Sequence, residues 1–405
     1  MSEISHNTGV SFVDRFHHLP LRSWHEACLN RPSEEVLKAI EGTVPGIRRF
    51  LALISPAAEG HLEAICHCSR SITQQRFGKV IRLFAPLYVS NECINNCSYC
   101  GFSRDNPILR VTLKPDEVIR EAKALLDQGF RNILLVAGEH PKFVSTGYME
   151  ACLRELRNRV PGLSLEIGPM ETEEYRPLVK AGAEGLVVYQ ETYDSSVYQA
   201  MHTAGPKKDF DWRLETPERG YRAGFRRLGI GALFGLADWR SEAIALAVHA
   251  QHLLKTCWKA QITISFPRLR PCAGSFEPLT QLSDIHLVQL VAAFRICFPD
   301  VGLVLSTRES ASLRNGLMPL GITLMSAGSH TEPGGYTGAG KENIHQTLQG
   351  RIVKLSDEDD SPQEDLQATG QFDIADERSP EEMAQQIREL GYEPVWKDWD
   401  TAILG

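Results

Sequence analysis

The sequence lacks the features that would place it at a membrane or on nucleic acid. It contains no uninterrupted apolar run of about 20 residues, the length that a membrane-spanning helix needs. Its formal net charge is −8 and its pI is about 5.9, so no excess of positive charge is present to bind phosphates. The first residues, MSEISHNTGVSF, show no basic region followed by an apolar run, and we expect no signal peptide. We therefore expect neither a nucleic acid nor a membrane as partner.

Regularly spaced cysteine pairs are also missing. The ten cysteines among 405 residues are clustered, and none follows Cys297. This is not the pattern of a secreted disulfide framework, and it favours a cytoplasmic location. Cys66 and Cys68 flank His67 in a predicted helix over 61–75, where adjacent side chains point in different directions. We interpret these three as core or surface residues.

In place of cysteine pairs the sequence has one tight trio. Cys93, Cys97 and Cys100 lie in NECINNCSYCGFS with the spacing C-x3-C-x2-C. Three thiolates this close can bind three irons of a four-iron cluster and leave the fourth iron without a protein ligand. A structural zinc site needs four ligands, and no second cysteine pair follows at a suitable spacing. Buried thiols or an irregular zinc site are the alternatives.

Short apolar runs alternate with longer amphipathic stretches from about residue 82 onward. Eight such runs occupy 83–90, 133–137, 163–167, 186–190, 228–234, 261–266, 303–306 and 322–326. Apolar strands separated by helices indicate a parallel sheet that is covered on its faces. Eight strand–helix units predict an α/β fold of the (β/α)8 barrel type, with an open doubly wound sheet as the alternative. In a barrel, the residues that follow the strands gather at one mouth.

Helix signals divide the chain into three parts. Helices are predicted over 115–128, 241–257 and 284–297, the first with Pro115 at its first position and Gly129 just past its end. We expect a helical N-terminal extension at 1–80, the barrel at 81–330 and a C-terminal extension at 331–405. In the first extension, Ser33 is expected to cap a helix.

The C-terminal extension combines four predicted segments. A glycine-rich loop at 334–340 is expected to be flexible, and 354–365 is an acidic linker. Ser379 and Glu382 form a capping box, with Pro380 at the first helical position, for a helix that ends at Gly391. The aromatic tail VWKDWD, at 395–400, is expected to dock on this chain or on a partner.

The cysteine trio resembles the signature of the radical S-adenosylmethionine (SAM) enzymes, C-x3-C-x-aromatic-C, with Tyr99 as the aromatic residue. In that superfamily the cysteines bind a [4Fe-4S] cluster, whose open iron chelates the amino and carboxylate groups of SAM. An electron from the cluster cleaves SAM to methionine and a 5′-deoxyadenosyl radical. The resemblance implies that Cys93, Cys97 and Cys100 ligate iron and that Tyr99 contacts the cofactor.

Polar residues that follow the next three strands are predicted to bind SAM. Ala137-Gly138-Glu139 resembles the Gly-Gly-Glu-like motif that contacts the SAM amino group, with Ala137 in place of the first glycine. Glu166 is expected to bind the ribose hydroxyls, and two residues after the fourth strand complete the set. Beside Tyr99, the predicted cofactor contacts are Gly138, Glu139, Glu166, Gln190 and Glu191.

Residues after the last strands are predicted to bind an amino acid substrate. Arg308 suits bidentate recognition of a carboxylate, although a salt bridge to Glu309 is the alternative. A nearby serine can orient an amine. The predicted substrate contacts are Ser306, Arg308 and Ser326, with Arg268 and Arg270 as secondary candidates for the carboxylate.

More narrowly, the chain resembles the tyrosine lyases of thiamine biosynthesis, the 2-iminoacetate synthases, over about residues 80–400. The matching segments are CINNCSYCGFS, NILLVAGEH, LEIGPM, YQETY, LSTRE, MSAGSH, FDIADERSPEE and PVWKDWD. The first six also resemble the maturase that makes carbon monoxide and cyanide for the [FeFe] hydrogenase, and partly a tryptophan lyase. That maturase has an extra cluster on cysteines near its C-terminus, and such cysteines are missing from this sequence.

The resemblance implies cleavage of the Cα–Cβ bond of L-tyrosine to 2-iminoacetate (dehydroglycine) and 4-cresol, for the thiazole of thiamine. It implies no catalytic side chain beyond the cluster and the SAM radical, which takes a hydrogen from the substrate nitrogen. The implied protein partners are thiazole synthase and a flavodoxin- or ferredoxin-type electron donor. The alternatives are a related radical SAM lyase of tryptophan or hydrogenase-maturase type and a non-catalytic metal-binding scaffold.

Overall fold

The computed structural model describes residues 10–348, 351–353 and 367–397. Within these residues, eight parallel strands close into a barrel, because the first pairs with the last and Leu83 lies opposite Met325. The (β/α)8 prediction is therefore confirmed, and the open doubly wound sheet is wrong. In barrel order the strands are β1 (Val80–Ser90), β4 (Asn132–Ala137), β5 (Gly162–Glu166), β6 (Gly185–Val187), β8 (Arg227–Gly231), β9 (Gln261–Ser265), β10 (Gly302–Leu305) and β11 (Leu324–Ser326).

Side chains along the barrel strands alternate between two environments, although the strand sequences are almost continuously apolar. In β1, Leu83, Ala85 and Leu87 are fully buried, whereas the alternate residues Phe84, Pro86 and Tyr88 line a cavity inside the barrel. Successive side chains on a strand point to opposite faces, so one set packs under the helices and the other faces the barrel interior. The interior is thus available for a site.

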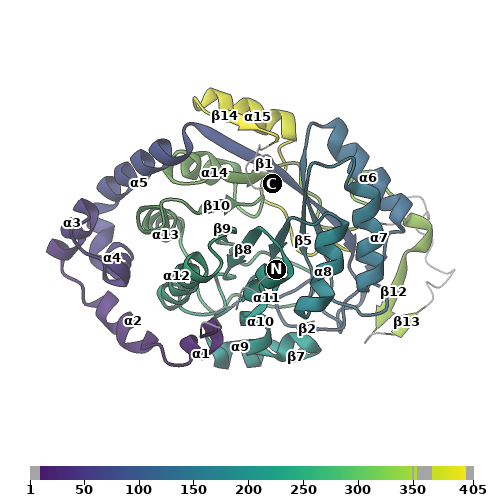
Figure 1. The fold of residues 1–405 in the computed structure, drawn as a ribbon, viewed down its shortest axis with the longest axis horizontal. Helices are drawn as coiled ribbons and strands as arrows, with labels where there is room; N and C mark the ends of the chain where they lie inside the picture. The colour runs from purple at the N-terminus through teal and green to yellow at the C-terminus, as the bar shows by residue number, and fades with distance from the viewer. Residues whose placement is uncertain (1–9, 349–350, 354–366, 398–405) are drawn as a thin grey trace, which may run out of the picture.

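A ring of helices surrounds the barrel (Figure 1). Its members are α6 (Pro115–Asp127), α7 (Thr146–Leu156), α8 (Thr172–Ala181), α9 (Ser195–Met201), α10 (Phe210–Leu214), α11 (Thr216–Ala223), α12 (Trp239–Thr256), α13 (Asp284–Cys297), α14 (Ala311–Leu317) and α15 (Pro380–Glu389). α6 begins at Pro115 as predicted, and α13 has the predicted bounds with Ser283 as its cap. The Ser379–Glu382 capping box of α15 is confirmed, and Gly391 follows the helix with a φ of +77°.

The N-terminal helices form an outer layer against one side of this ring (Figure 1). They are α1 (Phe12–Phe16), α2 (Leu21–Leu29), α3 (Ser33–Glu41), α4 (Gly46–Leu53) and α5 (Leu62–Phe77). Gln289, buried on α13, donates to the carbonyls of Leu53 and Ser55 at 3.0 and 2.9 Å, which satisfies the end of α4. The Ser33 cap prediction is wrong: Pro32 precedes the helix without a side-chain cap, and the Ser33 hydroxyl contacts His61.

The C-terminal extension packs closely on the barrel. β12 (His345–Leu348) pairs with β3 (Ile108–Arg110) and β13 (Arg351–Val353), while β14 (Glu393–Val395) pairs in parallel with the start of β1. The Trp396 ring meets Phe130 at 5.2 Å, so the described part of the tail docks on this chain. Trp399 and the acidic linker at 354–365 lie outside the described residues.

The glycine-rich loop at 334–340 is anchored, in contrast to the flexibility expected from its sequence. The buried carboxylate of Glu121 accepts hydrogen bonds from the backbone N–H groups of Tyr336 and Thr337 at 2.9 and 2.8 Å. The Tyr336 hydroxyl also donates to the Pro86 carbonyl at 2.7 Å. In the part of the chain that the structure describes, no helix is both long and apolar enough to cross a membrane.

Candidate active site

The cysteine loop follows β1 and is held from within by one buried arginine. Arg110 is 1% exposed, and its guanidinium donates to the carbonyls of Phe102 and Ser103 at 3.1 and 2.7 Å, and also to that of Asn91. On the opposite side of the loop, β2 (Asn96–Cys97) pairs with β7 (His202–Ala204). These contacts fix the loop that carries the three cysteines.

The three thiols share one buried environment with hydrogen-bond donors aimed at sulfur. Burial raises the pKa of Cys93, Cys97 and Cys100, and each thiol also interacts electrostatically with another of the trio. Cys93 accepts hydrogen bonds from the backbone N–H groups of Asn95 and Glu139, and Cys100 accepts from that of Phe102. Such donors stabilise thiolates that have lost their protons to metal. The donor set therefore fits an iron–sulfur cluster.

A mononuclear metal centre needs a different arrangement. Among the described residues, no group of three or more His, Cys, Asp or Glu side chains is placed to hold a single metal ion. In a four-iron cluster each thiolate binds its own iron, so the sulfurs need not meet at one point.

Gly138 and Glu139 pack directly against the cysteine loop. A Cβ at Gly138 would lie 2.3 Å from the Glu92 carbonyl oxygen, so only glycine allows this approach. Asn95 donates to the Glu139 carboxylate at 2.6 Å, and the Glu139 carbonyl accepts the Ile94 N–H at 2.8 Å. The close neighbour of Gly138 is thus the protein backbone; its predicted contact with SAM stays a prediction.

A buried charged cluster follows β6. The Glu191 carboxylate is 2.6 Å from Lys207 Nζ and 3.3 Å from Arg213 Nη2. Burial would raise the pKa of Glu191, but the two cations outweigh burial and hold that pKa below its ordinary value. Lys207 also counteracts the effect of burial on the pKa of Cys97, so positive charge adjoins the trio. Beside Glu191, the Gln190 amide nitrogen donates to the Phe210 carbonyl at 3.3 Å, while its buried Oε1 has no partner among the described residues.

Tyr99 is oriented by a neutral histidine. The His202 Nδ1 is 2.7 Å from the Tyr198 carbonyl, which can only accept, so Nδ1 carries the proton. The Tyr99 hydroxyl therefore donates to His202 Nε2, at 2.7 Å. Burial lowers the pKa of His202 to about 3, which keeps the ring neutral. The Tyr99 ring is thus fixed within the cysteine loop, with Lys207 Nζ 5.5 Å from its centroid.

A cavity occupies the mouth of the barrel beside these groups. Four of the predicted residues line it, namely Glu166, Ser306, Arg308 and Ser326, together with the aromatic residues Phe84, Tyr88, Tyr189, Phe266 and Phe372. Burial raises the pKa of Glu166 to about 7, and the negative charge of Glu191 adds to this effect while Arg308 opposes it. Ser329 also lines the cavity, and its buried hydroxyl has no partner among the described residues.

Arg308 is the principal cation of this cavity. Its guanidinium carbon lies 3.4 Å from the centroid of the Phe372 ring, so one face of the group is covered. The alternative of a salt bridge between Arg308 and Glu309 is not what the structure has. Glu309 instead accepts a hydrogen bond from Arg268 Nε at 3.0 Å. Arg268 also pairs with Asp284 at 2.7 Å and lies outside the cavity lining. This placement weighs against its predicted substrate contact, which stays a prediction.

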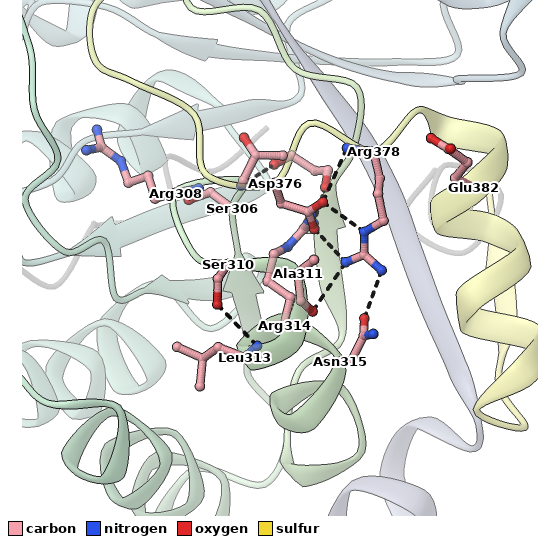
Figure 2. A network of polar contacts seen from close by, with 12 residues as sticks. Ser306, Arg308, Ser310, Ala311, Leu313, Arg314, Asn315, Asp376, Arg378 and Glu382 are labelled. Atoms are coloured by element: carbon pink, nitrogen blue, oxygen red, sulfur yellow. Dashed lines mark hydrogen bonds and ion pairs between the residues drawn. The ribbon is translucent and has the colours of Figure 1, made fainter.

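The segment 368–378, which we name the C-terminal strap, crosses the mouth of the barrel. Its backbone bonds to loops after four strands: Thr369 N–H to Leu109, Gln371 N–H to Thr331, Asp373 N–H to Pro271 and Ala375 N–H to Thr307, at 2.9 to 3.0 Å. Figure 2 shows its anchor, in which buried Asp376 pairs with Arg314 and Arg378 while the Arg308 side chain points away from this network.

Sequence reasoning missed the residues that the strap and the β6 loop contribute. Gln371 and Phe372 fall at the edge of FDIADERSPEE, a matching segment to which no role was given. Lys207 and Arg213 belong to no motif, and their basic side chains after the fourth predicted strand are the one signal that the sequence offers for them. Each was hidden because its contact is made with a residue distant in sequence.

Two family descriptions match the chain. One, "Radical SAM superfamily", matches residues 87–246, and the other, "Biotin and Thiamin Synthesis associated domain", matches residues 265–393. The chain is 39% identical over 395 residues to the 2-iminoacetate synthase of Escherichia coli K12, which covers 96% of this chain and 97% of that protein. The 2-iminoacetate synthase of Salmonella typhimurium gives the same identity and coverage.

Solved structures of [FeFe]-hydrogenase maturases share the fold. The maturase HydG from Carboxydothermus hydrogenoformans matches with a TM-score of 0.80 and 32% identity, covering 96% of this chain and 84% of that chain. A second HydG crystal structure matches with a TM-score of 0.84 and 31% identity, covering 96% and 82%. A methylornithine synthase, with a TM-score of 0.66 and 19% identity, shares the fold.

The cysteine trio predicts an outcome for metal content. We expect anaerobically reconstituted protein to hold about four irons and four sulfides per chain, and the Cys97→Ala variant to lose most of both. Cys272→Ala is the matched control, since its thiol lies 3.4 Å from the Tyr99 carbonyl but outside the trio, and it should keep full iron. One zinc per chain, or unchanged iron in Cys97→Ala, would contradict the assignment.

Proposed function

This chain belongs to the 2-iminoacetate synthase family of radical SAM enzymes, and we propose that it cleaves the Cα–Cβ bond of L-tyrosine to 2-iminoacetate and 4-cresol. The observation that carries the proposal is a single cavity in which a stacked arginine faces aromatic walls directly beside the cysteine loop. The arginine suits the carboxylate of an amino acid, and the aromatic walls suit its ring.

Cys93, Cys97 and Cys100 would hold the [4Fe-4S] cluster. The backbone N–H groups that point at Cys93 and Cys100 would stabilise the thiolates, and Lys207 would balance the charge near Cys97. When bound, the cluster and SAM supply the one-electron chemistry that gives a 5′-deoxyadenosyl radical. The protein contributes binding, orientation and exclusion of water.

The predicted SAM contacts surround the cysteine loop on two sides. Glu139 accepts a hydrogen bond from Asn95 of that loop, and its carboxylate would also accept one from the SAM ammonium. The unpartnered Oε1 of Gln190 is a buried acceptor that a hydroxyl or amine of the cofactor would satisfy. Lys207 and Arg213, held by Glu191, supply positive charge for the SAM carboxylate. Glu166, with its pKa near 7, can accept from or donate to ribose hydroxyls.

The substrate would be held by its amino acid end. Arg308, covered on one face by Phe372, presents its N–H edge to the carboxylate. The Ser326 hydroxyl oxygen accepts the Thr307 N–H at 3.2 Å, which leaves its second lone pair for the substrate amine. Ser306 lines the same wall. Fixing both groups aims the nitrogen, because a bound reactant gains rate when its reacting atoms are pre-positioned.

Sequence identity distinguishes the 2-iminoacetate synthases from the maturase alternative. The chain is 39% identical to the E. coli 2-iminoacetate synthase, but 31% and 32% identical to the two HydG chains. The printed sequence also has no cysteine after Cys297. Both observations support the tyrosine lyase over the maturase.

We further propose two protein partners, thiazole synthase and a flavodoxin- or ferredoxin-type electron donor. An imine hydrolyses readily, so direct delivery to the enzyme that consumes it would limit loss. The described tail up to Lys397 packs on this chain through Trp396, and residues 398–405 follow it in the sequence. These last residues are our candidate for contact with thiazole synthase.

The activity is tested by anaerobic incubation of the reconstituted protein with SAM, a reductant and tyrosine. We expect 5′-deoxyadenosine and 4-cresol to appear together in chromatography, and no indolic product when tryptophan replaces tyrosine. Deoxyadenosine without 4-cresol would show that the substrate is a different molecule.

Arg308→Lys should raise the tyrosine KM about 10- to 100-fold, because a charge-assisted hydrogen bond is worth about 1.5–3 kcal/mol. Lysine keeps the charge but loses the planar fork and its stacking on Phe372. Iron content should not change. Arg270→Lys, on a loop residue outside the cavity lining, is the control. An unchanged KM in Arg308→Lys removes the residue from the carboxylate role.

Removal of residues 398–405 should abolish co-purification with thiazole synthase while tyrosine turnover stays at the level of the full chain. A cut before Gln371 is unsuitable, because it would also remove the strap and β14. If the shortened enzyme co-purifies as fully as the intact one, the contact with thiazole synthase lies elsewhere.

A further inference from the structure

The side chain of Gln371 lies between a cluster cysteine and the substrate cavity. Its amide nitrogen is 3.9 Å from Cys100 Sγ, within reach of a hydrogen bond to sulfur. Its amide oxygen accepts the hydroxyl of Tyr88 at 2.8 Å. Gln371 and Tyr88 both line the cavity that contains Arg308. One amide group thus joins the predicted cluster to the cavity wall.

The backbone of Gln371 is also fixed. Its N–H donates to the Thr331 carbonyl at 3.0 Å, and its carbonyl accepts the Gly101 N–H at 3.2 Å. A Cβ at Gly101 would lie 2.6 Å from that carbonyl oxygen. The residue directly after Cys100 must therefore be glycine for the strap to reach the cysteine loop. The backbone of Gln371 is therefore fixed against the cysteine loop, and the hydrogen bond from Tyr88 holds its side-chain amide.

The orientation of the amide follows from the chemistry of its neighbours. A thiolate accepts hydrogen bonds and has no proton to donate, so the NH₂ end of the amide faces Cys100. Tyr88 then donates its hydroxyl proton to the amide oxygen. The amide oxygen can only accept, so the Tyr88 hydroxyl must be the donor across this 2.8 Å contact. Tyr88 holds the amide in the orientation that suits a thiolate ligand.

We propose that Gln371 is a positioning residue that donates its amide N–H to the Cys100 thiolate and thereby raises the reduction potential of the cluster. Hydrogen bonds to the cysteine sulfurs are one of the factors that set the potential of iron–sulfur clusters. An N–H donor stabilises the reduced cluster more than the oxidised one, because reduction adds negative charge. The inference rests on the proposed function, since it requires the cluster.

The same part of the strap also touches the substrate arginine. Phe372 follows Gln371 in the chain and covers the guanidinium of Arg308. The Asp376–Arg314 pair anchors the strap a few residues further on, at a site where both side chains are almost fully buried. The strap therefore contributes adjacent residues to the environment of the cluster and to the substrate pocket.

The test is the midpoint potential of the cluster in the full, reconstituted chain without SAM, followed by electron paramagnetic resonance. In Gln371→Leu we expect the ratio of reduced to oxidised cluster at a fixed potential to fall about tenfold, a shift of about 59 mV for one electron. Iron and sulfide content should match the wild type. Gln385→Leu is the matched control on α15, where the exposed amide bonds only to Glu389 among the described residues, and its potential should not move.

Each outcome has a separate meaning. A lower potential in Gln371→Leu with full iron supports the proposal, and an unchanged potential with full iron overturns it while the lyase assignment stands. Wild-type protein that binds no four-iron cluster overturns the proposed function itself. If Gln371→Leu loses iron, the Tyr88→Phe variant tests the proposal instead. This substitution leaves the strap backbone in place and releases the Gln371 amide. A lowered cluster potential in Tyr88→Phe supports the proposal, and an unchanged potential rejects it.

Discussion

The pairing of β1 with β11 is the contact on which the site depends. The cysteine loop follows the first strand of the barrel, whereas Ser326 ends the last strand and Arg308 follows the one before it. In an open sheet these strands could lie at opposite edges. Closure places Phe84 opposite Ser326, and the fully buried Leu83 and Met325 pack beside them. The cysteine trio and the residues proposed to hold a substrate share one mouth only because the sheet is closed.

The strap completes this mouth, and its anchor explains how it stays in place. Asp376 and Arg314 are at most 1% exposed, and Arg378 joins the same carboxylate. Removing one partner of a buried pair leaves an unpaired charge, at a cost of about 3–5 kcal/mol, so the two groups depend on each other. The backbone of the strap also bonds to four loops at the mouth of the barrel. One wall of the cavity, at Gln371 and Phe372, is therefore formed by a segment distant in sequence from the barrel strands.

Local features of the sequence were predictable, and contacts between distant segments were not. The strands, the proline start of α6 and the Ser379–Glu382 box follow from periodicity and capping, which depend on neighbouring residues. The prediction of Ser33 as an N-cap was wrong because the helix begins at Ser33 itself, so the serine lies one residue after the N-cap position, which Pro32 occupies. Gly138 was expected to serve a ligand, yet its nearest neighbour is Glu92. Gln371, Phe372 and Lys207 reach the site through tertiary contacts that no local pattern encodes.

Glu191 shows how backbone strain and charge combine at the site. Among the described residues it is the one non-glycine with a positive φ, at 71°, a conformation that costs on the order of 1 kcal/mol or more. In return its carboxylate lies 2.6 Å from Lys207 Nζ, beside Cys97. A cluster on three thiolates adds negative charge to a buried region, and an unpaired buried lysine would tend to lose its proton. With Glu191 as its partner, the pKa of Lys207 is raised despite burial, so the cation stays charged where the thiolates need it. The strained residue thus keeps a charged lysine beside the cysteine trio that we propose holds the cluster.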